Sequence, residues 1–470
     1  MKELIPLWKH QRDTAAKAAG RAGYALLFEQ GTGKTATAIT VLRHKCYAAK
    51  RLLRTVVFCP PVVRRSWERE FLAHSTIKKE MIHVLAGPGK DRVAEFKRLS
   101  EKPGIFITNY ESLGMMDLFR LLKEWRPEVL IFDESQRVKD IKAKRTKLAI
   151  ELSDIATNKL ILTGTPILNS AMDIWSQFRI LDGGATFDKN FYAFRARYFI
   201  DRNAGMPAHK RFSDWVPIPG LEDIFHEKIY AKATRVLKKD CLDLPPLVKQ
   251  RVEVELAHDQ RRMYDDMEED FIAYLGSKAC VASIALTKGL RLQQMVSGFW
   301  VDELENKPHD FKTNPRVKAL SELLEEIAPE HKIIVWASFR HNYDAIAKLC
   351  DALGLSYVGL YGGMTDNARQ NSIDNFQTDP TVRIMIANPA AGGVGVTLTA
   401  ASYMIYYSRS FHLEHDLQSE ARCHRGGSEI HEKITRIDIV APGTIDQKVL
   451  EALERKENLA SGILKLRELL

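Results

Sequence analysis

Short apolar runs alternate with amphipathic segments over residues 24–167 of the chain. The runs are YALLF, TVVFCP, GIFITN, VLIFDE and KLILTG. Apolar runs of this length are typical of parallel strands that are buried on both faces, and the segments between them are typical of crossover helices. The pattern therefore predicts a parallel sheet flanked by helices.

The pattern changes between residues 170 and 300, where aromatic and charged residues follow a mostly helical period. Proline-rich breaks interrupt this region at DWVPIPG and LDLPPL. From residue 331 the strand pattern returns in KIIVWAS, SYVGLYG, VRIMIAN, YMIYYS and KITRIDIV. We therefore expect two α/β units with a helical region between them, and a ligand cleft between two lobes.

One apolar run ends in a glycine-rich turn, in the segment LLFEQGTGKTATAI. Gly31 and Gly33 allow the backbone to curl so that successive N–H groups converge, and a helix that opens at Thr35 favours an anion. Lys34 can reach the β- and γ-phosphates, and the Thr35 hydroxyl can bind magnesium. The strict phosphate-loop pattern has glycine where Phe28 stands, so a chance occurrence is the alternative. The strand-loop-helix context favours a nucleoside triphosphate site.

A pair of carboxylates follows the buried run in VLIFDESQ. Asp133 at a strand end beside a phosphate loop can hold magnesium, and Glu134 can orient and deprotonate the attacking water. A solvated acidic pair at a strand end is the alternative. Glu29, inside the loop, is a weaker candidate because it can simply hydrogen-bond the backbone.

Basic residues gather in two further segments. RVKDIKAKRTK, residues 137–147, holds six basic residues and one acidic residue, and is either a solvated helix face or a phosphate contact. In HDLQSEARCHRGGS, Arg422 and Arg425 are three apart and are expected to share a helix face. Two guanidiniums aimed across a cleft would stabilise charge on a γ-phosphate. Pairing with nearby acids such as Glu420 is the alternative.

Composition narrows the class of protein. The 470 residues, 45% hydrophobic and 27% charged, are ordinary for a soluble chain of two or three domains. The start is charged too early for a secretion signal, and no apolar run predicts a membrane span. Six scattered cysteines without a CxxC pair argue against zinc and disulfides, so we expect a reducing intracellular compartment. The net charge of +9 fits a nucleic-acid partner, although solubility explains it equally well.

The ordered set of motifs resembles the Swi/Snf-type (Snf-two) ATPases of helicase superfamily two, over about residues 5–465. In chain order the matching segments are LWKHQRDTA, FEQGTGKT, TVVFCPPVVRRSWERE, FITNYESL, DESQ, LTGTPI, ATRVLKKDCLDLPP, ANPAAGGVGVTLTAAS and HDLQSEARCHRGGS. The order and spacing carry the resemblance, because each segment alone is only moderately specific. Gln136, Thr397 and Ser428 depart from the usual His, Asn and Gln of the family.

The resemblance implies an α/β fold of two RecA-like parallel-sheet lobes with helical insertions and an ATP-binding cleft between them. Lobe 1 is expected at residues 1–230, with its insertion at about 170–230. Lobe 2 is expected at residues 231–470, with an insertion at about 255–300 and brace helices at about 443–470.

The resemblance also implies ATP and Mg²⁺, and it assigns roles to residues of this sequence. Catalysis is expected from Lys34, Asp133, Glu134, Arg422 and Arg425, and magnesium binding from Thr35 and Asp133. Nucleotide contacts are expected from Gln11 as the reader of adenine and from Gly31, Thr32, Gly33, Lys34, Thr35, Gly395 and Gln418. Contacts to DNA phosphates and sugars are expected from Arg64, Arg65, Asn109, Tyr110, Phe339, Arg340 and Thr397.

Several of these aromatic and basic residues have simpler interpretations. Phe339 can be a core residue, and Arg64 and Arg65 can be solvated. Trp67 and Trp336 lie in strand-adjacent motifs and are expected in the core, not as stacking platforms for bases.

The resemblance implies an ATP-dependent translocase on double-stranded DNA that remodels protein–DNA complexes or branched DNA, by fork regression or branch migration. Because the motor fills nearly the whole sequence, we expect a monomeric bacterial or viral version that acts in the cytoplasm, or in the nucleus if the source is eukaryotic. An ATP-gated DNA-binding switch stays open because it needs the same residues, and a strand-separating helicase stays open because a short hairpin could supply the wedge it needs. The helical insertions favour the duplex-DNA family over an RNA-directed ATPase.

Overall fold

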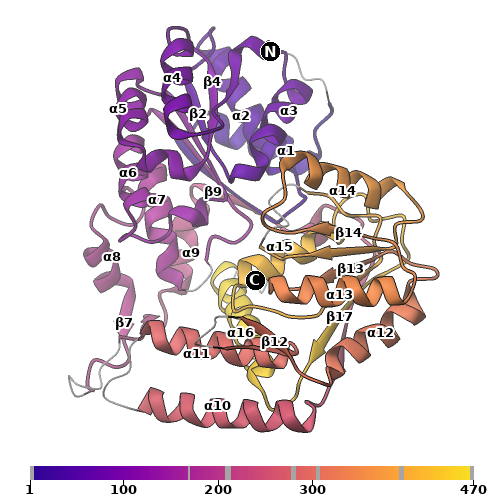
Figure 1. The fold of residues 1–470 in the computed structure, drawn as a ribbon. Helices are drawn as coiled ribbons and strands as arrows, with labels where there is room; N and C mark the ends of the chain where they lie inside the picture. Colours follow the sequence, from indigo (N-terminus) through magenta and orange to yellow (C-terminus); the bar gives the residue numbers. More distant parts are fainter. Residues whose placement is uncertain are drawn as a thin grey trace. The chain divides into compact units, whose positions relative to one another are not determined.

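The chain divides into two compact units in the computed structural model, which describes residues 5–167, 170–206, 213–276, 282–302, 307–390 and 396–465 (Figure 1). The first unit runs to Leu242 and also takes in the chain from Lys456 onward, and the second is Asp243–Arg455. Among the described residues, no helix combines the length and apolar character that crossing a bilayer requires.

The first unit is built on a seven-stranded parallel sheet with the strand order β3-β4-β2-β5-β6-β1-β9. Its strands are β1 (Gly23–Phe28), β2 (Thr55–Phe58), β3 (Ile82–Val84), β4 (Ile105–Thr108), β5 (Val129–Asp133), β6 (Asn158–Leu162) and β9 (Ala233–Val236). Every residue of β1, β2, β4 and β5 is buried, because helices cover both faces of the sheet. The five strands predicted within residues 24–167 are present as β1, β2, β4, β5 and β6.

Nine complete α-helices of the described residues belong to this first unit. They are α1 (Lys9–Ala19), α2 (Lys34–Ala48), α3 (Arg64–His74), α4 (Gly89–Leu99), α5 (Met116–Trp125), α6 (Lys144–Ser153), α7 (Ile174–Asp182), α8 (Phe191–Tyr198) and α9 (Glu222–Tyr230). An antiparallel pair, β7 (Phe199–Asp201) and β8 (Trp215–Pro217), follows α8. The α7–α9 region packs through buried aromatic rings, with Phe187 stacked 4.9 Å from Phe225 and edge-on 5.3 Å from Phe194. The predicted helical insertion is thus joined to the main core.

The two compact units divide at 242/243, beyond the lobe boundary predicted at 230/231, and the chain from Lys456, predicted for lobe 2, groups with the first unit. The reason for the later boundary is β9, which pairs in parallel with β1, so that Ala233 lies opposite Ala25 in the first sheet. The sequence of β9 is ATRV, too short and too polar to stand out as a strand.

The second unit contains a six-stranded parallel sheet with the order β10-β17-β16-β13-β15-β14. Its strands are β10 (Leu247–Glu253), β13 (Ile333–Trp336), β14 (Tyr357–Leu360), β15 (Ile384–Ala387), β16 (Tyr403–Tyr406) and β17 (Ile434–Val440). Its helices are α10 (His258–Gly276), α11 (Ala282–Val296), α12 (Pro315–Ile327), α13 (Arg340–Ala352), α14 (Asp366–Thr378), α15 (Leu413–Cys423) and the start of α16 (Ile445–Lys465). A short hairpin joins β11 (Phe299–Val301) to β12 (Pro308–Asp310). The predicted fold class, α/β with two parallel sheets and helical insertions, is confirmed.

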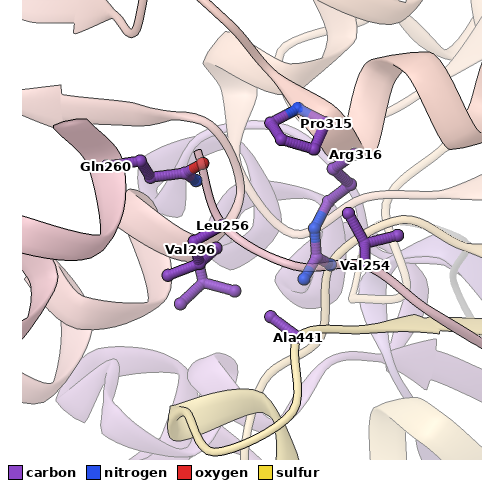
Figure 2. Close-up of a pocket in the computed structure, with 7 residues that line it drawn as sticks. All are labelled: Val254, Leu256, Gln260, Val296, Pro315, Arg316 and Ala441. Atoms are coloured by element: carbon purple, nitrogen blue, oxygen red, sulfur yellow. The ribbon is translucent and has the colours of Figure 1, made fainter. Parts of the chain in front are cut away.

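The inserted helices α10 and α11 attach to the second unit around a narrow crevice beside a buried arginine (Figure 2). The crevice is lined by Val254, Leu256, Gln260, Val296, Pro315, Arg316 and Ala441. The crevice is too narrow to admit a water molecule. Arg316 is 3% exposed, donates to the carbonyls of Tyr407 and Ile439, and pairs with Asp446. One guanidinium thus joins α12, the residue that follows β16, the strand β17, and α16.

Candidate active site

The polar motifs of the first unit lie at the carboxyl edge of its sheet. Because all seven strands are parallel, the segments that follow them emerge at one edge, where ligands of such sheets bind. The glycine-rich loop follows β1 and the acidic pair ends β5, with β6 between these two strands. The topology alone therefore brings the two predicted motifs to neighbouring positions.

The glycine-rich loop needs its glycines. Gly31 and Gly33 have φ angles of 86° and 85°, in the left-handed region that other residues rarely adopt. A Cβ on Gly33 would lie 1.8 Å from Nε2 of Gln11, so the loop also packs closely against α1. Helix α2 begins at Lys34, and its first N–H groups have no partner within the helix. The loop therefore ends in the kind of helix N-terminus that binds phosphate.

Gln11 is buried against this loop. Its Oε1 accepts from the N–H of Trp8 at 3.0 Å, and its Nε2 donates to the carbonyl of Thr32 at 3.4 Å. The ring of His10 also contacts the Thr32 carbonyl, at 2.8 Å. An amide group can make four hydrogen bonds, so these contacts leave capacity for a base. The role of Gln11 in reading adenine stays a prediction.

Lys34 lies along the loop. Its Nζ donates to the carbonyl of Phe28 at 2.9 Å and reaches that of Glu29 at 3.5 Å. Burial raises the pKa of Asp133, and the positive charge of Lys34 opposes that rise without cancelling it. Glu29 itself accepts from the N–H of Lys238 at 2.8 Å, as the backbone-bonding alternative predicted.

Asp133 is held by a tryptophan. The indole Nε1 of Trp67 donates to Oδ2 of Asp133 at 2.8 Å, and both side chains are buried. Burial and the nearby charge of Glu134 raise the pKa of Asp133 to about 7. A divalent cation beside it would restore the ionised form. Trp67 is a core residue, as expected, but its contact with Asp133 was not predicted.

Glu134 has the features of a general base. It is 1% exposed and adopts a left-handed backbone with φ of 53°, which is unusual for a non-glycine residue. Its Oε2 accepts from Nε2 of Gln136 at 2.8 Å, whereas Oε1 is buried with no hydrogen-bond partner in the described part of the chain. A buried carboxylate oxygen with open lone pairs is suited to accept a proton from a bound water.

The residues fit magnesium bound in a nucleotide complex. Within the described ranges, no group of three His, Cys, Asp or Glu side chains converges as a metal cage. Magnesium in triphosphate sites is held by one or two protein groups together with phosphates and waters, so such a cage is not required. Thr35, in the first turn of α2, and the buried Asp133 remain the predicted ligands.

The acidic motif contacts the LTGTPI segment through Gln177 of α7. The hydroxyl of Ser135 donates to Oε1 of Gln177 at 2.7 Å, and Nε2 of Gln177 donates to the carbonyl of Pro166 at 2.7 Å. Ser135 and Gln177 are fully buried. Gln177 was not predicted from the sequence, although a glutamine within the apolar stretch of α7 is a signal of a buried polar contact.

Two of the predicted DNA contacts of the first unit are buried. Tyr110 is 1% exposed and its hydroxyl donates to the carbonyl of Asp133 at 2.7 Å, so the prediction that it touches DNA does not fit the structure. Its ring continues the aromatic core instead of facing solvent. Asn109 is 6% exposed, and its Oδ1 accepts from Arg92 at 2.8 Å and from Ser112 at 2.9 Å.

The two arginines at the start of α3 differ. Arg64 donates to the carbonyls of Pro61 and Leu85, at 3.0 and 2.9 Å. The side chain of Arg65 is 72% exposed and pairs with Glu68 at 2.9 Å. Arg65 is therefore the more accessible of the two for a phosphate.

The second unit brings Arg422 and Arg425 together. Helix α15 ends at Cys423, so the prediction that both arginines share a helix face is wrong. Even so, each NH1 lies 3.3 Å from the carbonyl of Val396. Glu420, their proposed alternative partner, pairs with Arg436.

The other residues predicted for the second unit differ in how far they are exposed. Gln418 is buried and donates to Glu414 at 3.1 Å, and Gly395 lies outside the described residues. Phe339 and Thr397 are half-buried, and the ring of Phe339 lies edge-on 5.7 Å from another aromatic ring, that of Phe299. Arg340 is exposed at the start of α13, whereas Trp336 is fully buried, as expected.

Two protein-family models match this chain, and the first of them extends past the boundary between the two compact units. The sequence matches the SNF2-related domain family over residues 15–297 and the helicase conserved C-terminal domain over residues 315–427. The first match alone covers more than half of the chain. These matches confirm the resemblance that the motifs indicated.

Three curated relatives illustrate the similarity. The TATA-binding protein-associated factor mot1 of Schizosaccharomyces pombe is 23% identical over 93% of this chain and 25% of its own length. A SWI/SNF-related matrix-associated actin-dependent regulator of chromatin subfamily A-like protein 1 homolog of Caenorhabditis elegans is 26% identical, over 96% of this chain and 61% of its own. An uncharacterized ATP-dependent helicase of Mycoplasma genitalium is 25% identical, over 94% of this chain and 40% of its own length. The chain thus spans between a quarter and 61% of these relatives.

Among solved structures, the Sulfolobus solfataricus SWI2/SNF2 ATPase core in complex with dsDNA is similar, at a TM-score of 0.44 and 23% identity. The similarity covers 100% of this chain and 96% of that one.

Proposed function

This chain belongs to the SNF2-related family, and we propose that it is an ATP-dependent translocase on double-stranded DNA that remodels protein–DNA complexes or branched DNA. The observation that carries the proposal is the buried Asp133–Glu134 pair, which lies beside the phosphate loop and leaves one oxygen of Glu134 with no hydrogen-bond partner among the described residues. Such an arrangement suits hydrolysis of a nucleotide better than its storage, because it provides a base for the attacking water.

In this proposal Lys34 and the N–H groups at the start of α2 bind the phosphates. Glu134 orients a water and takes its proton as the bond to the γ-phosphate breaks. Magnesium, held by Thr35 and Asp133, would neutralise phosphate charge. Arg422 and Arg425, from the second unit, would stabilise the charge that develops on the γ-phosphate.

The proposal of DNA as the partner rests on charge and on the family. The net charge of +9 favours a polyanion, and Arg65 and Arg340 offer exposed guanidiniums for backbone contacts. Two of the relatives carry TATA-binding protein or chromatin in their names. Because backbone contacts carry no sequence information, we expect binding to be sensitive to salt and tolerant of sequence.

ATP turnover measured against duplex length tests the proposal. Total base pairs are held constant at low salt, and single-stranded and four-way junction DNA are run alongside. A protein that walks on duplex gives a rate that climbs with length and then saturates. A rate that depends on DNA but not on its length contradicts translocation and selects an ATP-gated switch. A strong preference for the junction selects branch migration, and a strand-displacement assay identifies a helicase.

A further inference from the structure

Five buried charged side chains join α15 to the second sheet. They are Arg409, Asp416, Glu420, Arg436 and Asp438, each between 5% and 13% exposed. The two acids Asp416 and Glu420 belong to α15, whereas the other three residues follow β16 or lie on β17. The pairs therefore cross from the sheet to the helix that carries Arg422.

Arg436 is the centre of this network. Its NH2 lies 3.0 Å from Asp416, its NH1 2.5 Å from Glu420 and its Nε 3.3 Å from Asp438. Asp416 and Glu420 are four residues apart and therefore share one face of α15. A planar guanidinium that contacts both of them fixes how far the helix is rotated and how far it is shifted along its axis.

A second arginine and a tyrosine complete the attachment. NH1 of Arg409 lies 3.1 Å from Asp416, and NH2 pairs with Asp438. The guanidiniums of Arg409 and Arg436 lie over the ring of Tyr406, at 4.2 and 4.5 Å from its centre. The Tyr406 hydroxyl shares a hydrogen bond of 2.7 Å with Ser419 of α15.

The two acids of α15 are ionised at neutral pH. Burial alone would raise the pKa of Asp416 and of Glu420, but the arginines beside them hold both pKa values below the usual range. Buried ionic networks lose much of their attraction to the cost of desolvation, so they add little stability over an apolar contact. What they add is a defined geometry, which an apolar contact between helix and sheet does not enforce.

We propose that Arg436 and Arg409 are positioning residues for Arg422 and Arg425. Arg422 lies in the last turn of α15 and Arg425 two residues beyond its end, so both depend on where that helix sits. The inference rests on the proposed function, in which these two arginines act on the γ-phosphate. By holding the acidic face of α15 against the sheet, the network would keep the guanidiniums of Arg422 and Arg425 directed at one point. In this structure both contact the carbonyl of Val396.

A charge-neutralised variant of the full chain, Arg436→Met with Asp416→Asn and Glu420→Gln, tests this role. It leaves the Arg409–Asp438 pair in place and abandons no buried charge, so it is expected to fold. We expect kcat for ATP with duplex DNA to fall by about tenfold or more, since small misplacements cost about 10²-fold. The KM for ATP should stay within about twofold, because the phosphate loop is untouched. Amide hydrogen exchange in residues 413–423, measured without nucleotide, should become faster.

The matched control is Arg316→Met with Asp446→Asn, an ion pair of the same unit that shares no hydrogen bond or ion pair with α15 among the described residues. It should leave kcat and the exchange of α15 unchanged. If the test variant keeps the kcat and the amide exchange rate of the wild type, the inference is overturned. It is also overturned if the control loses as much kcat as the test variant. If the test variant does not fold, Arg436→Lys replaces it, because a lysine keeps the charge but cannot bridge both carboxylates. A wild-type kcat in Arg436→Lys would also overturn the inference.

Failure of the inference and failure of the proposed function give different results. A wild-type protein without DNA-stimulated hydrolysis contradicts the function, whereas the exchange of α15 still reports whether the network holds the helix.

Discussion

The indole Nε1 of Trp67 lies 2.8 Å from Oδ2 of Asp133, and the two buried residues come from different elements, α3 and the end of β5. An indole N–H can only donate, so this contact fixes the orientation of the carboxylate. Trp67→Phe keeps most of the ring and removes the donor. We expect kcat for ATP to fall by about 10- to 100-fold, as when the partner of a metal-ligating group is lost.

Trp336→Phe is the matched control. Trp336 is also fully buried, but its Nε1 has no hydrogen-bond partner within the described ranges. Steady-state turnover as a function of magnesium concentration measures both variants, with thermal melting to confirm folding. Equal losses in the two variants would show that Trp67 contributes ring volume and not orientation.

Lys34→Ala should abolish ATP hydrolysis and leave much of the DNA binding. Lys34 follows the loop directly, at the position where the phosphate-loop motif predicts contact with the β- and γ-phosphates. Turnover and duplex binding, the latter by fluorescence anisotropy, are measured on the same preparation. Normal turnover in this variant would contradict the assignment of the phosphate site.

Arg425→Ala should lower turnover far more than nucleotide affinity. A guanidinium that meets charge only in the transition state contributes about 10³-fold or more in rate and little to ground-state binding. Single-turnover rates and the Kd of a fluorescent ATP analogue separate the two effects. A parallel loss of rate and affinity would assign Arg425 to the fold, through its contact with Val396.

The apolar pattern predicted the central strands because burial on both faces leaves a run such as VLIFD without polar residues. It did not reveal β9 or β10, whose sequences ATRV and LVKQRVE contain exposed or half-buried polar residues. Such strands form because they pair with distant strands, β9 with β1 and β10 with β17. The sequence of β9 or β10 alone does not show this pairing.

The candidate site was likewise predicted only in part from the sequence. Motif spacing predicted Lys34, Asp133 and Glu134, because their chemistry follows from a strand end and a glycine loop. It missed Trp67 and Gln177, which reach these motifs only through the tertiary fold. A single sequence also does not show where a helix stops, so the end of α15 before Arg425 was placed incorrectly.

Glu128 gives a prediction about pH. Hydrogen bonding by Arg51 and Arg54 lowers the pKa of Glu128 to about 2, from an ordinary value of 4.5. Its stabilisation is therefore complete above about pH 4.5 and is lost as the pH falls toward 2. Arg51 is 53% exposed and solvent screens the pair, so Glu128→Gln should cost about 1 kcal/mol at pH 7.

Urea unfolding of wild type and Glu128→Gln at several pH values between 7 and 3 measures this effect. The gap between the two proteins should be constant down to about pH 4.5 and then narrow. A gap that is independent of pH would mean that the carboxylate charge does not contribute.

Arg316 should be among the most sensitive positions of the second unit. Its side chain is 3% exposed, and Arg316→Met leaves Asp446 partly buried without its cation and removes the donor to two main-chain carbonyls. We expect a loss of about 3–5 kcal/mol in the free energy of unfolding, measured in urea. Adding Asp446→Asn should recover part of it, since the abandoned charge is then gone. Lys318→Met, on the same helix but 80% exposed, should change stability by less than about 0.5 kcal/mol. A loss in Arg316→Met as small as that in Lys318→Met would mean that apolar packing alone holds α12 to α16.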